Sequence, residues 1–149
     1  YMAIRIELEN LKVDTDSVQL SLLLGTNGGL TLYNATNDYT FISTALTAGF
    51  GLSGTTDKIN ISTSDIGNDA GEYFQSSIEI QINRSIYAGC AINTSSLYQK
   101  TDGAQKNHRT FGALVNQIAP IDSVQLVWES GNFVPIGVIR AYGLLIWMD

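Results

Sequence analysis

Residues 3–10, AIRIELEN, alternate strictly between apolar and charged side chains after the opening alanine. Ile4, Ile6 and Leu8 share one side of an extended chain, and the charged residues between them share the other. Successive side chains of a β-strand point to opposite faces of its sheet. The stretch therefore predicts a strand with one buried face and one wet face.

The same period of two recurs along most of the chain. In residues 76–85, SSIEIQINRS, three isoleucines alternate with polar residues, and residues 18–25, VQLSLLLG, continue the pattern. Further strands are predicted within residues 30–33, 39–51, 58–63, 87–93, 95–100, 109–115, 123–130 and 138–147. No segment sustains the 3.6-residue period of a long amphipathic helix. Short strands with turn signals about every 8 to 12 residues predict one all-β domain over residues 1–149, an antiparallel, jelly-roll-like β-sandwich.

The pentapeptide DSVQL occurs twice, at residues 16–20 and 122–126, and the two copies need an explanation. A tandem repeat would carry similarity on both sides of the match, and this sequence does not. Asp-Ser is suited to closing a turn, and Val-Gln-Leu then begins an alternating strand. We therefore expect two strand starts with Val18, Leu20, Val124 and Leu126 facing the core, because a slip of one residue would bury the glutamines.

The composition argues against two kinds of partner. The formal charge is -6 with only 8 Lys and Arg residues, which disfavours nucleic acid, because phosphate neutralisation needs clustered cations. The longest apolar run, residues 143–148, is far shorter than the roughly 20 residues of a membrane-spanning helix. No basic-then-apolar signal peptide opens the chain. We expect a soluble protein that neither binds nucleic acid nor inserts into a membrane.

Catalytic motifs are sparse. His108 is the single histidine, no Gly-x-Ser-x-Gly stretch occurs, and Cys90 has small apolar neighbours that predict a buried structural thiol. Carboxylates that folding could pair for glycoside cleavage are Glu72, Glu79, Asp102, Asp122 and Glu129. On alternating strands such residues are usually the solvated face. We therefore predict no catalytic residues and no cofactor.

Two acidic stretches supply oxygen atoms near turns. They contain Asp14 and Asp16 in the first stretch, and Asp65, Asn68, Asp69 and Glu72 in the second. Neither stretch has the spacing of the calcium-binding EF-hand loop. Ordinary turn chemistry explains both, and no metal site is predicted.

Three segments together carry a resemblance: residues 5–29 (RIELENLKVDTDSVQLSLLLGTNGG), residues 64–72 (SDIGNDAGE) and residues 121–144 (IDSVQLVWESGNFVPIGVIRAYGL). They resemble a β-sandwich domain that recurs in structural proteins of tailed bacteriophages, commonly as a C-terminal module of tail-fibre-like proteins. The most specific positions are Ser130, Gly131, Asn132, Gly137, Ile139, Arg140, Tyr142, Gly143 and Leu144. The resemblance implies a virion location, other virion proteins as partners, and an end module of a longer protein. Residues 87–119 and the terminal LIWMD depart from the pattern.

The departing tract supplies the residue types that bind sugars. A pyranose ring needs an aromatic platform for its apolar face and amide or charged groups for its hydroxyls. Candidates are Tyr87, Asn93, Tyr98, Gln99, Asp102, His108 and Arg109. Because binding residues often lie on loops held by a rigid scaffold, we expect this tract to bind host-surface saccharide.

Three functions follow as hypotheses. The favoured one is a non-enzymatic tail-fibre or tail-tip module of a phage virion that contacts a host-surface saccharide. The alternative is a purely structural module that decorates the capsid or braces the tail and binds only other virion proteins. The third is a glycan-degrading enzyme.

The C-terminal run predicts self-association. Alternation sends Leu145 and Trp147 to one face and Ile146 and Met148 to the other, so both faces of the last strand need a cover. One face can pack on the sandwich, and the other then needs a partner. Because phage fibre proteins are commonly trimeric, the resemblance implies a homo-oligomer, expected as a trimer, with these four residues at its interface.

Overall fold

The computed structural model describes residues 2–45, 51–63, 65–82 and 89–145. Within these ranges every regular element is a strand, and no helix that could cross a membrane is found. The strands are β1 (Met2–Leu11), β2 (Leu20–Thr26), β3 (Thr31–Leu32), β4 (Tyr39–Ala45), β5 (Gly51–Thr56), β6 (Ile59–Asn60), β7 (Phe74–Ile82), β8 (Cys90–Gln99), β9 (Gln105–Leu114), β10 (Ser123–Trp128) and β11 (Val138–Leu145).

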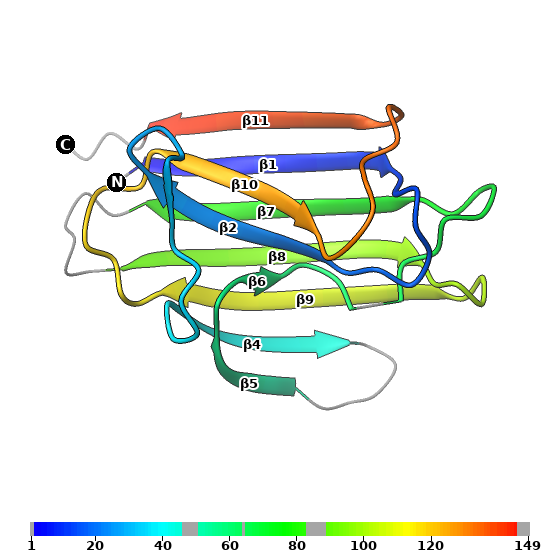
Figure 1. Cartoon of the computed structure of the whole chain (residues 1–149), viewed down its shortest axis with the longest axis horizontal. Helices are drawn as coiled ribbons and strands as arrows, with labels where there is room; N and C mark the ends of the chain where they lie inside the picture. The colour runs from blue at the N-terminus through cyan, green and yellow to red at the C-terminus, as the bar shows by residue number, and fades with distance from the viewer. Residues whose placement is uncertain (1, 46–50, 64, 83–88, 146–149) are drawn as a thin grey trace.

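The strands form two sheets, one in front of the other (Figure 1). The large sheet has seven strands in the order β11-β1-β7-β8-β9-β4-β5, and the small sheet has four, with β2 between β10 and β3 and β6 also paired to β2. All the pairings are antiparallel. The prediction of an all-β, antiparallel sandwich is therefore confirmed. The jelly-roll connectivity, which is built from two Greek keys, stays a prediction.

The core lies between the sheets and follows the alternation of the sequence. In β7, Ile78 and Ile80 are fully buried, whereas Glu79 between them is exposed. Leu22 and Leu24 of β2 are also fully buried and belong to the same apolar cluster. Each such side chain contributes about 1.5–3 kcal/mol relative to an exposed one. Burial of one face of the large sheet thus leaves its other face free for function.

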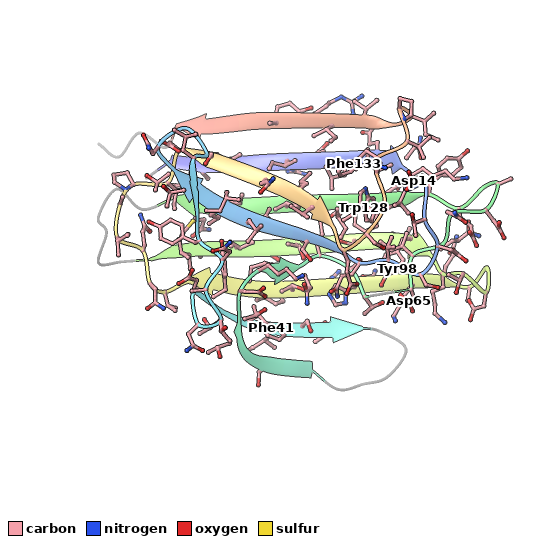
Figure 2. The ribbon with its side chains drawn as sticks, in the orientation of Figure 1. Asp14, Phe41, Asp65, Tyr98, Trp128 and Phe133 are labelled. Carbon is pink, nitrogen blue, oxygen red and sulfur yellow. The ribbon has the colours of Figure 1, made fainter. Side chains whose placement is uncertain are left out.

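Aromatic rings close the core at one end of β10. The ring centroid of Trp128 lies 5.3 Å from that of Phe133 and 6.2 Å from that of Phe74. Figure 2 shows Trp128 and Phe133 beside Asp14. The Asp14 carboxylate accepts a 2.7 Å hydrogen bond from the Asn132 backbone N–H, and this bond helps to hold the pKa of Asp14 below its usual range. The SGNF segment, residues 130–133, is therefore tied to the residues that follow β1.

Both copies of DSVQL lead into strands, as predicted. Val18 and Leu20 are buried, and Val124 and Leu126 pack against the core. Gln125 is exposed, and Gln19 donates to the Ser62 carbonyl at 2.9 Å. The copies differ in one respect: β10 begins at the second residue of its copy, whereas β2 begins only at the fifth. Ser17 has a positive φ of 58°, which delays the first strand.

The strands β8 and β9 are longer than the sequence predicted. Two separate strands were expected at 87–93 and 95–100, but β8 runs without a break from Cys90 to Gln99. Half of the expected polar connection, residues 101–108, is strand as well, because β9 begins at Gln105. Thr94 and Ser96 point inward as polar residues and hide the alternation; the Ser96 hydroxyl, for example, donates to the Ile61 carbonyl at 2.6 Å.

Cys90 occupies the inner face of β8 and is buried. Burial raises the pKa of its thiol to about 12. Because the thiolate is the reactive form of cysteine, this position is chemically quiet. The prediction that Cys90 is a small buried residue is confirmed.

Candidate functional site

The outward face of the large sheet is the face turned away from the small sheet (Figure 1). Every second residue of each strand points to this face. Paired residues of neighbouring strands point to the same side. Exposed residues of β8 on this face are Ala91, Asn93, Ser95 and Leu97. The buried residues between them face the core. A candidate site can therefore be assembled from the strand registers.

One row of outward residues crosses the middle of the sheet. Asn93 of β8 is paired with Glu79 of β7 on one side and with Phe111 of β9 on the other. The row continues to Arg5 of β1 beyond Glu79 and to Ile42 of β4 beyond Phe111. Directly opposed Cβ atoms lie about 4.5–5.5 Å apart in such pairs. An aromatic ring, an amide and a carboxylate are therefore immediate neighbours.

A hollow of about 270 Å³ opens beside this row. We call it the Phe111 hollow; it is lined by Glu79, Gln81, Ala91, Ile92, Asn93, Phe111 and Gly112. The methyl group of Ala91 fills little space, so the taller side chains around it form a rim. Phe111 remains half exposed, at 52%. A second hollow of about 330 Å³, lined by β4 and β9, lies against the same ring.

Gly112 has a structural role under the Phe111 hollow. A Cβ atom at this position would lie 2.5 Å from the Ile59 side chain of β6 and 3.1 Å from the Thr40 carbonyl oxygen. Only a glycine therefore lets β6 pack this closely on β9. The close packing holds the strand that carries Phe111 firmly in place.

The charges on the β1 side of this face are mostly paired. Arg5 contacts Glu7 at 2.8 Å, and Arg140 contacts Glu9 at 2.5 Å. The bond from Arg140 lowers the pKa of Glu9 and correspondingly raises the pKa of Arg140. Glu79 has a different environment, since Gln81 Nε2 donates to it at 3.4 Å. Its carboxylate remains available as a hydrogen-bond acceptor in the Phe111 hollow.

The structure divides the predicted saccharide residues between the two faces of the sheet. Asn93 and Arg109 lie exposed on the outward face, where Arg109 is paired with Ser95 and with Thr44. Arg109 precedes Phe111 by two residues, so it points to the same side of β9. Two members of the predicted set thus stand close to the Phe111 hollow.

Tyr98 faces inward, and its predicted role as an exposed sugar platform was wrong. The residue is 1% exposed, and its ring lies 5.7 Å from that of Phe74. Its hydroxyl accepts from the Thr63 backbone N–H at 3.0 Å and lies 2.6 Å from the Thr63 hydroxyl. Burial raises the pKa of Tyr98 to about 12. The tyrosine is a core residue with a fully satisfied polar end.

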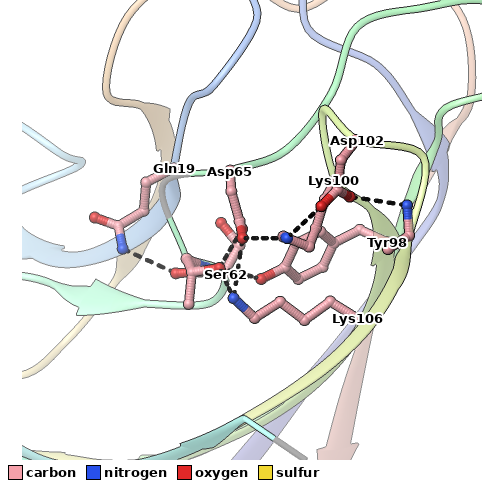
Figure 3. A network of polar contacts seen from close by, with 9 residues as sticks. Gln19, Ser62, Asp65, Tyr98, Lys100, Asp102 and Lys106 are labelled. Atoms are coloured by element: carbon pink, nitrogen blue, oxygen red, sulfur yellow. Dashed lines mark hydrogen bonds and ion pairs between the residues drawn. The ribbon is translucent and has the colours of Figure 1, made fainter. Parts of the chain in front are cut away.

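The Tyr98 hydroxyl belongs to a polar network at the end of the sandwich (Figure 3). The Thr63 hydroxyl donates to Asp65, and Lys106 Nζ donates to Thr63 Oγ1 at 2.9 Å and to Asp65 Oδ2 at 3.0 Å. Since Thr63 uses its one proton on Asp65, the Tyr98 hydroxyl is the donor to Thr63. Every hydroxyl here has its partners, so the network fastens the loop after β6 to β8 and β9.

His108 also faces inward, which corrects its place among the saccharide candidates. It is 4% exposed, and its Nε2 lies 3.0 Å from the Thr110 hydroxyl. Burial is the main reason that the pKa of His108 is lowered. An imidazole buried to this degree has no access to an external ligand.

The remaining candidates lie elsewhere. Gln99 ends β8, and Asp102 lies in the following turn, where Lys100 Nζ contacts its carboxylate at 2.8 Å. Gln99 is six residues along β8 from Asn93, or roughly 20 Å. Tyr87 lies outside the described residues. The predicted set therefore does not form one site.

Sequence reasoning missed Phe111, the aromatic residue at the centre of the outward face. The tract was chosen by its polarity and its departure from a family pattern, and Phe111 fell just beyond the selected residues. The signal was available in the alternation: once β8 and β9 are recognised as strands, Asn93, Arg109 and Phe111 share the parity of the exposed positions.

The carboxylates of the acidic turns accept hydrogen bonds from backbone N–H groups and from a lysine. Asp16 accepts from the Asn68 N–H at 3.1 Å, and Glu72 accepts from the Asp69 N–H at 2.6 Å. Asp65 is engaged by Lys106. These contacts are the turn chemistry that the sequence predicted. Within the described ranges no cluster of three or more His, Cys, Asp or Glu side chains suited to a metal ion is present.

Comparisons with family models, curated proteins and solved structures gave no match. The resemblance to phage virion proteins therefore stays a prediction. Of the predicted oligomer residues, Leu145 ends β11, and Ile146, Trp147 and Met148 lie outside the described residues.

Proposed function

We propose that this protein is a non-enzymatic attachment module of a bacteriophage tail fibre or tail tip that binds host-surface saccharide on the outward face of its large sheet. The observation that supports saccharide binding is the Phe111 hollow. An exposed aromatic ring faces an amide and a carboxylate across two adjacent strand pairs. The phage assignment rests on the sequence resemblance.

The chemistry of the Phe111 hollow matches that of a sugar ring. The apolar face of a pyranose packs on an aromatic side chain, and its hydroxyls need both donors and acceptors. Asn93 and Gln81 supply both, whereas Glu79 supplies acceptors. All three line the hollow together with Phe111. Because this is an open surface on rigid strands, it suits one or two sugar units of a longer chain.

Catalysis is not part of the proposal. Glu79 is the one carboxylate among the residues that line the Phe111 hollow, and glycoside hydrolysis normally requires a pair. Incubation of the purified chain with host polysaccharide should release no reducing ends. Release that disappears in Glu79→Gln would identify an enzyme and overturn this part of the proposal.

Binding is tested by calorimetric titration of the purified chain with oligosaccharides from host cell envelopes. Phe111→Ala should weaken binding by about tenfold or more, since a stacked contact contributes on the order of 1–3 kcal/mol. Leu97→Ala is the matched control, because Leu97 is a similarly exposed apolar residue on the same face, at 44%. Equal losses in both variants, or no loss in Phe111→Ala, would rule out the Phe111 hollow as the site.

Phage particles distinguish attachment from the alternative, a module that only braces the tail or decorates the capsid. If the domain attaches the phage to its host, phages that carry Phe111→Ala should adsorb poorly to host cells while their particles remain intact. Normal adsorption together with particles that fall apart would favour bracing. Imaging of the particle then decides whether the domain occupies the tail tip, the shaft or the shell.

A homo-oligomer also belongs to the proposal. The trimer implied by the resemblance stays a prediction, which light scattering of the purified protein measures directly. A mass of three chains would support the trimer, whereas a mass of two chains would contradict it.

A further inference from the structure

Strand β11 forms one edge of the large sheet (Figure 1). It pairs with β1 from Leu145 to Val138 in a continuous antiparallel register. On its other side no strand of the described residues is paired with it. An eight-residue strand therefore presents a row of backbone N–H and C=O groups to the outside. Such an edge is a template for another strand.

Most side chains of β11 are apolar, and residues 138–143 are exposed on both faces of the strand. Ile139 lies on the core side of the sheet, opposite the fully buried Leu8 of β1, but is itself 52% exposed. The small sheet therefore ends above β1 and does not reach β11. On the outward face, Val138 and Tyr142 are 43% and 44% exposed. Apolar residues exposed on both faces of one edge usually indicate a contact surface.

The two edges of the sheet differ in the character of their side chains, because β5 is small and polar whereas β11 carries large apolar residues. Strand β5 ends the sheet with small polar residues, including Ser53 and Thr55. Strand β11 contains no proline and no lysine, and its register with β1 has no bulge. Its one charge, on Arg140, is ion-paired with Glu9. With Arg5 and Glu7 also paired, the charges beside this edge cancel, so a second copy would meet little repulsion.

We propose that β11 binds β11 of a second copy of this chain in antiparallel fashion and joins the two large sheets into one. This contact is independent of the saccharide proposal. In such a dimer, a two-fold axis runs perpendicular to the sheet. Even-numbered residues of β11 then pair with even-numbered residues of the other copy, and odd-numbered with odd-numbered, so only a few registers are available. An axis at Arg140 places two arginines opposite each other and is unfavourable. The interface is therefore expected at another centre.

An axis at Ala141 gives complementary pairs. On the outward face, Arg140 of each copy then lies opposite Tyr142 of the other, where a guanidinium can pack on an aromatic ring. On the core side, Ile139 of each copy lies opposite Gly143 of the other. A Cβ atom added at Gly143 would meet nothing within 4 Å, so the space for the isoleucine is open. Because the axis is two-fold, this contact joins two copies of the chain, whereas the resemblance implies three.

Sedimentation of the full 149-residue chain over a range of concentrations tests the proposal. The wild type should reach the mass of two chains. Gly143→Glu should fold, because the position is open, but should weaken dimerisation at least about tenfold by placing a charge opposite Ile139. Ile139→Lys should have the same effect. Val115→Lys is the control, because Val115 is 50% exposed and lies in the loop after β9, away from β11. In this variant the dimer should persist.

Hydrogen exchange gives a second readout. Amides of β11 that face the free edge should gain protection as the protein concentration rises, whereas amides of β5 should not change. A wild type that stays monomeric, a trimeric mass, or a dimer that survives Gly143→Glu would each overturn the proposal. Circular dichroism establishes that each variant is folded, and if Ile139→Lys is not, the Gly143→Glu result decides.

Discussion

The inner and outer faces of the β8–β9 hairpin consist of alternating residues of the same two strands, yet they have different roles. The inner face holds Tyr98 and His108, which are almost fully buried. The outer face holds Asn93, Arg109 and Phe111, which are exposed. A displacement of one position along the chain moves a residue from the core to the solvent. Parity along the strand, rather than residue type, therefore separates the core residues from the exposed residues in this tract.

The largest effect is expected from a neighbouring pair on β7. Ile80→Ala removes a fully buried side chain and should lower the free energy of unfolding by about 2–5 kcal/mol, through lost transfer energy and the cavity left behind. Glu79→Ala, one residue earlier on the outward face, should change it by less than about 0.5 kcal/mol. Urea denaturation measures both. Similar losses in the two variants would contradict the assignment of the faces.

Tyr98 provides the next test. Tyr98→Phe keeps the ring but removes the hydroxyl that accepts from the Thr63 N–H, and should cost about 1–3 kcal/mol because that donor is left without its partner. Arg109→Ala on the outer face should leave stability nearly unchanged. Chemical denaturation provides the comparison. A stable Tyr98→Phe protein would show that the network in Figure 3 contributes little.

The inner face should also give the stability a pH dependence through His108. Its pKa in the folded chain is lowered from 6.5, mainly by burial, so the unfolded chain binds a proton that the folded chain does not. The free energy of unfolding should therefore fall as the pH drops from about 7 to about 5 and level off above the ordinary histidine pKa.

Urea denaturation at several pH values between these limits measures the slope, and His108→Gln should remove most of it. Carboxylates such as Asp14, whose pKa is lowered, titrate below this window and do not interfere. A slope of the same size in His108→Gln would assign the effect to another group.

The smallest effect on stability is expected at the Phe111 hollow itself. Asn93→Ala should leave the thermal midpoint almost unchanged, because the residue is exposed and none of the described hydrogen bonds involves its side chain. Thermal denaturation followed by circular dichroism checks this. A clear loss of stability would mean that Asn93 supports the sheet, and the outer face could then not be assigned to recognition alone.

The candidate site was only partly predictable because its residues come from three strands. Within β7, alternation alone placed Glu79 outward, but nothing local indicates that Asn93 and then Phe111 follow it in one row across the sheet. That neighbourhood depends on the pairing of strands distant in sequence. The selection of Tyr98 and His108 failed because inward Thr94 and Ser96 obscured the alternation, and their polarity is satisfied only by bonds to distant segments.

The sequence by itself determined most of the strands, their antiparallel sandwich and the inward direction of residues such as Val18, Leu20 and Ile80, because a period of two in apolar residues has few other ways to be buried. Tertiary structure alone decided which outward residues became neighbours, and that the small sheet ends above β1 and leaves β11 open. Local periodicity specifies which face of a strand is apolar. It carries no information on which strands pair or how far the covering sheet extends, since both depend on packing between segments far apart in the chain.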